Sequence, residues 1–141
     1  MRRVQQQSFE HADCGVACVA MLASCSYQQA FEVFGFAEDQ SVFFTRHHHL
    51  ISALEKLGCA VKRKQFRSWR EISGCAIVAV NRSQDGYWHW VAFDGEAVID
   101  PLPGKAGRKT GFLGLRGAGQ YLLCDGKYKL GALLRSDSIF E

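Results

Sequence analysis

The spacing of apolar residues changes near Gly58, and this change divides the chain into two halves. Before Gly58, apolar side chains recur at three- and four-residue intervals, which place them on one face of a helix. After Gly58 they form short alternating or β-branched runs, which are typical of strands. Helices followed by strands predict an α+β fold with an antiparallel sheet.

Three helices are expected in the first half. The segment CGVACVAMLASC (14–25) is apolar on most sides, as a buried central helix is, and Asp13 is expected to cap it by accepting hydrogen bonds from its first turn. A second helix is expected near 27–34. A third is expected to begin near Thr45, as its N-cap, and to end before Gly58.

The second half predicts strands at 59–66, 75–82, 88–95 and 96–100. Asp94-Gly95, between the last two of these, is a strong hairpin signal because it suits a tight turn. A glycine-rich loop follows Pro103. Beyond it, GQYLLC (119–124) is expected to form another strand and KLGALL (129–134) a closing element.

The length and composition indicate one globular domain spanning 1–141. The chain is 48% hydrophobic and 22% charged, and its net charge of +3 does not indicate a nucleic-acid partner. No apolar run approaches the ~18 residues that span a bilayer. The N-terminal MRRVQQQSFEHADC has no apolar stretch and is not a signal peptide. We therefore expect a cytoplasmic protein, or one delivered into a target cell's cytoplasm by a secretion machine.

The cysteine and histidine pattern does not predict a metal site or another cofactor. The six cysteines include no CxxC and no Cys/His set with zinc-ligand spacing, so reduced, mostly buried thiols are expected. The histidines at 47–49 are consecutive, and consecutive helical side chains diverge instead of converging on one ion.

Three residues form a candidate catalytic set. Cys14 opens a helix, where the partial positive charge of the N-terminus favours a thiolate. His89 lies in a strand-like run, and Asp100 ends the next one, a hairpin away from the imidazole. The set matches an activated nucleophile with its base and an orienting carboxylate. Taken singly, each residue has an ordinary structural alternative: a buried cysteine, a sheet histidine and an aspartate capping its own turn.

The same set requires an oxyanion hole and contacts to the substrate. The backbone N–H of Cys14 is one expected donor, and a side-chain amide from the run at 5–7 is the other. Three further residues beside the candidate set are expected to contact the substrate: Gly15, Trp88 and Trp90.

The segment QQSFEHADCGVACVAMLA resembles the active-site segment of the bacteriocin-processing cysteine peptidases. These papain-like domains cut leader peptides after a double glycine, often at the front of an ABC transporter. HWVAFDG resembles the family's histidine strand and VIDPLPG its aspartate turn, and the resemblance runs from about Gln5 to Gly104. It implies a papain-like fold, no cofactor, and Cys14, His89 and Asp100 as the triad.

The resemblance also implies an oxyanion glutamine, usually six residues before the nucleophile, where this chain has Ser8. Gln7 is the nearest glutamine, so it is the first candidate for this role and Gln6 the second.

The resemblance leaves the substrate and the biological setting open. The expected activity is hydrolysis of peptide bonds in a protein or peptide substrate, as a leader-processing enzyme or as a protease effector or toxin, which would have a cognate inhibitor or immunity protein. Glutamine deamidation or transglutamination would use the same triad, and a non-catalytic peptide-binding module would have the same fold. The basic stretch at 62–70 is expected to be a charged edge strand, with an acidic partner as the alternative.

Overall fold

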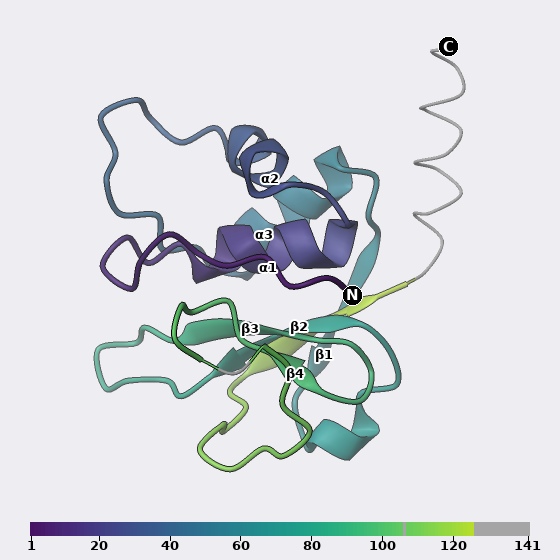
Figure 1. Ribbon diagram of the computed structural model, residues 1–141. Coiled ribbons are helices and arrows are strands. Elements are labelled where there is room, and N and C mark those ends of the chain that lie inside the picture. Colours follow the sequence, from purple (N-terminus) through teal and green to yellow (C-terminus); the bar gives the residue numbers. More distant parts are fainter. Residues whose placement is uncertain (106, 126–141) are drawn as a thin grey trace.

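The computed structural model describes residues 1–105 and 107–125, in which helices precede one sheet (Figure 1). The elements are α1 (Cys14–Ala23), α2 (Tyr27–Phe34), α3 (His47–Lys56), β1 (Val61–Gln65), the short 3₁₀ helix η1 (Trp69–Glu71), β2 (Ala76–Val80), β3 (His89–Phe93), β4 (Val98–Ile99) and β5 (Gln120–Cys124). The predicted α+β fold is confirmed. The closing element expected at 129–134 lies outside the described residues.

The five strands form one sheet in the order β1-β5-β2-β3-β4, and every neighbouring pair is antiparallel. β1 is an edge strand, as its basic composition predicts. The hairpin expected at Asp94-Gly95 joins β3 to β4. Gly95 takes a φ of 100°, and the Asp94 carboxylate accepts hydrogen bonds from the next two backbone N–H groups beyond it.

The helices α1, α2 and α3 cover one face of the sheet (Figure 1), and α1 packs against β3, α2 and α3. This central position explains why α1 is apolar on most sides, because nearly all of its residues are buried. Alternation along β3 divides its side chains between two cores. Trp90 and Ala92 join the helical core, whereas Val91 and Phe93 pack on the opposite face of the sheet.

The side-chain caps predicted at the N-termini of the first and third helices are wrong. Asp13 does precede α1, but its carboxylate makes no capping bond to the first turn. It accepts instead from the Gln7 backbone N–H at 2.7 Å and from the Tyr27 hydroxyl at 2.6 Å. The N-cap of α3 is Arg46, not Thr45. Thr45 is turned into the interior against α1, and its Oγ1 has no hydrogen-bond partner among the described residues.

Within the described residues, no helix combines the length and the apolar character that crossing a bilayer requires.

Candidate active site

Cys14 lies at the junction of α1 and the sheet. It is the first residue of α1 and only 5% exposed. The backbone N–H of Trp90, in β3, donates a hydrogen bond to Sγ over 3.4 Å. The strand that carries His89 therefore touches the thiol directly, although 76 positions separate the two bonded residues.

His89 and Asp100 are joined by a hydrogen bond of 2.8 Å between Nε2 and Oδ1. The sheet register explains the contact, because pairing of Ala92 with Ile99, continued outward, makes Asp100 a diagonal neighbour of His89 on the same face. Asp100 Oδ1 also accepts from the Leu102 N–H at 2.9 Å. Because Nε2 is held by the carboxylate, Nδ1 is the ring nitrogen left for Cys14.

The surroundings of His89 favour its charged form. Burial by itself lowers the pKa of the imidazole, but hydrogen bonds with Asp100 and Cys14, and their charges, outweigh it and raise the pKa to about 9. Burial of Asp100 acts to raise the pKa of its carboxyl, yet the bond to His89 leaves that pKa below its ordinary value. The two groups therefore stabilise each other as an ion pair.

The N-terminal segment holds the turn that carries Asp100. Arg3 donates from Nε to the carbonyl of Asp100 and from Nη2 to that of Leu102, each over 2.9 Å. The Gln6 N–H donates to the carbonyl of Pro101 over 2.8 Å. The sequence analysis missed Arg3, because no local spacing signals that a residue at the chain start pairs with a turn so far along the chain.

The two candidate oxyanion glutamines differ in their surroundings. The side chain of Gln6 is buried, and its Nε2 donates to the carbonyl of Ser8 at 3.0 Å and to Asp13 Oδ1 at 3.3 Å. Gln7 is exposed, and it is its backbone that binds Asp13. Asp13 therefore fixes both glutamines just before the nucleophile, a role that its position next to Cys14 did not reveal.

Two of the three residues expected to touch the substrate lie in the core. Trp90 is fully buried, and its Nε1 donates to the Thr45 carbonyl over 3.0 Å. Gly15 is buried too, and a Cβ there would overlap Thr45 Oγ1 and press on Leu50 and Trp90. Both residues pack beside the site, and their expected contacts with a substrate stay predictions. Trp88 lies nearer the surface, at 8% exposure.

The other cysteine of α1 that faces the site is buried more deeply. Cys18 is fully buried, as expected for a residue one turn beyond Cys14 on the same face. Its burial, followed by the charges of Cys14 and Asp100, raises its pKa well above the ordinary value. Cys18 is therefore an unreactive thiol beside the candidate nucleophile.

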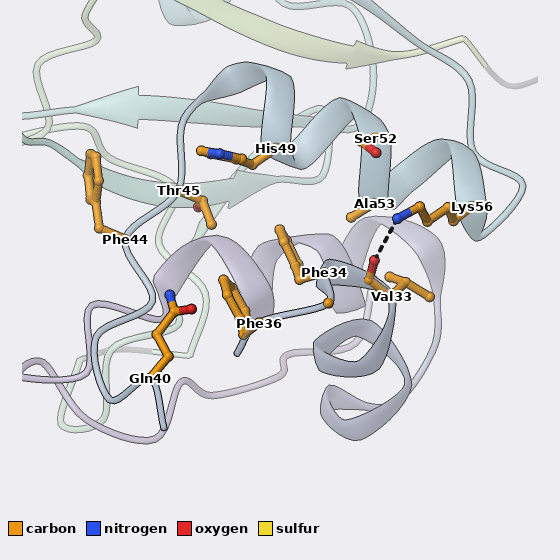
Figure 2. A pocket seen from close by; sticks show the side chains of 11 residues that line it. Val33, Phe34, Phe36, Gln40, Phe44, Thr45, His49, Ser52, Ala53 and Lys56 are labelled. Carbon is orange, nitrogen blue, oxygen red and sulfur yellow. Dashed lines mark hydrogen bonds between the residues drawn. The ribbon is translucent and has the colours of Figure 1, made fainter. Parts of the chain in front are cut away.

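A pocket of about 350 Å³ lies between α2, the 35–45 segment and α3 (Figure 2). Aromatic side chains of Phe34, Phe36 and Phe44 line it, together with Thr45. None of the three candidate catalytic residues lines this pocket. It adjoins the site through Thr45, which packs on Gly15.

A comparison with solved structures places this architecture among known folds. The crystal structure of a double glycine motif protease from an AMS/PCAT transporter, in complex with the leader peptide, matches with a TM-score of 0.61. The match covers 86% of this chain and 89% of that chain, at 19% identity. The chain has a papain-like fold. No protein-family model and no curated protein sequence matches it.

Proposed function

We propose that this papain-like chain is a cysteine peptidase with Cys14 as nucleophile, His89 as general base and Asp100 as the residue that orients the imidazole. The observation that carries the proposal is the meeting of three groups at one point. The imidazole of His89 is bonded to Asp100 on one side, and Cys14 raises its pKa from the other. Papain-like peptidases use a thiol and an imidazole that a third side chain, such as an asparagine, orients; here the third group is a carboxylate.

The chemistry follows from this arrangement. His89 takes the proton of the Cys14 thiol, which gives a thiolate beside an imidazolium that Asp100 stabilises. The thiolate attacks the carbonyl carbon of the substrate, and His89 then donates its proton to the leaving amine. Water, deprotonated by His89, releases the acyl group and restores the thiol.

The oxyanion hole is assigned to the backbone N–H of Cys14 and the side chain of Gln6, in place of Gln7. Gln6 is buried next to Asp13, whereas the Gln7 side chain is exposed. The bond from Gln6 Nε2 to Asp13 is long, at 3.3 Å, so the N–H that makes it is the one able to turn to a substrate oxygen.

The preferred substrate is a leader-type peptide with small residues at the cut. Two aromatic rings approach each other beside the site, with the centroids of Phe44 and Trp88 5.3 Å apart. Trp88 precedes His89, so bulky substrate side chains would meet these rings. This accords with the double glycine motif of the fold neighbour, which was solved with a leader peptide. For that reason we favour leader processing over a protease effector with an immunity protein.

The proposal is tested by alkylation and cleavage together. Cys14 should react with an iodoacetamide probe at about pH 6, where a free thiol of pKa about 8.5 is almost wholly protonated. The same preparation should cut peptides containing Gly-Gly, and Cys14→Ala should abolish both reactions. Cys25→Ala, which alters a half-exposed thiol, is the matched control. Slow labelling spread over several cysteines would contradict the proposal. A mass shift on glutamine with no cut would assign the site to deamidation instead.

The two glutamines provide a second prediction. Gln6→Ala should lower kcat by about a hundredfold with a smaller change in KM, because an oxyanion donor acts in the transition state. Gln7→Ala should change kcat less than about twofold, because its bond to Asp13 comes from the backbone. Steady-state kinetics on one peptide measure both. Equal losses in the two variants would remove Gln6 from the oxyanion hole.

A further inference from the structure

Two arginines lie over aromatic rings beside the candidate active site. The guanidinium of Arg46 lies 5.3 Å from the ring centroid of Phe44 and 5.6 Å from that of Trp88. The guanidinium of Arg82 lies 5.0 Å from the Trp88 centroid. Tyr87 extends the cluster by an edge contact with Phe44, at 4.8 Å between centroids. These five residues form the arginine–aromatic patch.

The charge of this patch is not balanced by the described part of the chain. Arg46 and Arg82 are exposed, and the ion pairs found within 4.0 Å in residues 1–105 and 107–125 involve neither of them. The excess positive charge acts on a neighbour, His47. Burial is the main cause of that residue's lowered pKa, and the charges of Arg63 and Arg82 lower it further.

The patch also contains a hydrogen-bond donor without an acceptor. Trp88 is more than nine-tenths buried, and its Nε1 has no hydrogen-bond partner in residues 1–105 and 107–125. A buried N–H without an acceptor is costly, so such groups call for a specific explanation. The guanidinium groups of Arg46 and Arg82 lie over the ring of this same side chain. A guanidinium over an aromatic ring keeps N–H groups that can donate to a carboxylate.

The patch is joined to the catalytic residues through two chain segments. Trp88 directly precedes His89, and Trp90 beyond it donates to Cys14 Sγ. On the helical side, Phe44 and Arg46 flank Thr45, whose carbonyl binds Trp90. The patch therefore lies on the same two chain segments that contact the candidate catalytic residues.

We infer that the arginine–aromatic patch binds an acidic side chain of the peptide substrate, close to the bond that is cut. This inference rests on the proposed peptidase function and adds a specificity element to it. A carboxylate would pair with Arg46 and Arg82 and give the patch its missing negative charge. The aromatic rings would exclude water from the pair and hold the guanidinium groups in place.

The test begins with a mixed peptide library from a digested cell lysate. Wild-type protein and Cys14→Ala are incubated with it, and mass spectrometry locates the cuts. Glu or Asp should be enriched at one position near the cut. A synthetic peptide of the best-cut sequence is then compared with its Glu→Gln partner. The ratio of kcat/KM for Glu over Gln should be about tenfold, the sum of two modest charge pairs. Added salt should lower this Glu/Gln ratio, because it screens the charge pairs.

Arginine variants assign the preference to the patch. In Arg46→Gln/Arg82→Gln the Glu/Gln ratio should fall to near one, and in the corresponding double Lys variant it should stay well above one. Arg70→Gln, an exposed arginine in η1, should keep the wild-type ratio. Cuts that depend on Cys14 but show no acidic preference would overturn the patch alone. If no peptide is cut in a Cys14-dependent way, the peptidase proposal itself fails.

Discussion

Replacing His89 with alanine should reduce Cys14-dependent peptide hydrolysis by about a thousandfold, with little change in KM. A positioned acid–base group contributes roughly this much, and the imidazole serves both attack and leaving-group protonation. Its loss also leaves Asp100 without its partner across 2.8 Å. Steady-state kinetics with a Gly-Gly peptide measure the effect, and His11→Ala, which alters a histidine outside the triad, is the control. A rate within tenfold of wild type would exclude His89 as the base.

The role of His89 also predicts how the peptidase activity changes with pH. The active pair needs His89 protonated, and its pKa is raised to about 9, so activity should persist at neutral pH and decline as the pH rises through about 9. Asp100→Asn keeps an oxygen that can accept from His89 but removes the negative charge that favours the imidazolium, so the alkaline decline should move to lower pH. An unchanged profile in that variant would mean that Asp100 does not tune the imidazole.

Replacing Gly15 with alanine should destabilise the fold by about 3 kcal/mol, or lower Tm by roughly 10 °C. A Cβ at this position would overlap Thr45 Oγ1, and it would also lie 3.0 Å from Leu50 and 3.1 Å from Trp90. These neighbours are buried, so none of them can move into solvent. Thermal unfolding followed by circular dichroism measures the loss.

Two further variants make the Gly15 prediction specific. At Gly111 a Cβ would meet nothing within 4 Å, so Gly111→Ala should leave Tm nearly unchanged. Adding Thr45→Ala to Gly15→Ala removes the overlapping hydroxyl and should recover part of the stability. If Gly15→Ala and Gly111→Ala have the same Tm, the close packing at the start of α1 is not what stabilises this region.

The periodicity of the sequence predicted the elements well because each signal is local. The apolar runs at β2 and β3 and the Asp94-Gly95 turn are each encoded within a few neighbouring residues. The three candidate catalytic residues could also be proposed from the sequence, because Cys14 opens a predicted helix and Asp100 ends a short predicted strand. The register of β3 and β4 brings His89 and Asp100 together, and the Asp94-Gly95 hairpin signal had already indicated this pairing in part.

The failures concern residues whose partners are remote in the sequence. Aspartate is a residue type typical of N-caps, but the Asp13 carboxylate accepts hydrogen bonds from the Tyr27 hydroxyl and the Gln7 backbone N–H instead. The bond from Tyr27 depends on how α2 packs on α1. Thr45 fails in the same way, because it packs on Gly15. Arg3 had no local signal at all, since both of its acceptors lie in the Asp100–Leu102 turn.

The bonds of Arg3 also bear on the order of events during synthesis. Its two acceptors lie 97 and 99 positions further along the chain, and Cys14 must wait for β3 to arrive before the imidazole can stand beside it. A chain emerging from the ribosome therefore exposes its thiol long before the imidazole and the carboxylate of the candidate site have been made. Contacts this distant in sequence form late and slow the folding of small domains. Under the proposed peptidase function, the growing polypeptide would be unable to cut its neighbours until His89 and Asp100 have been made.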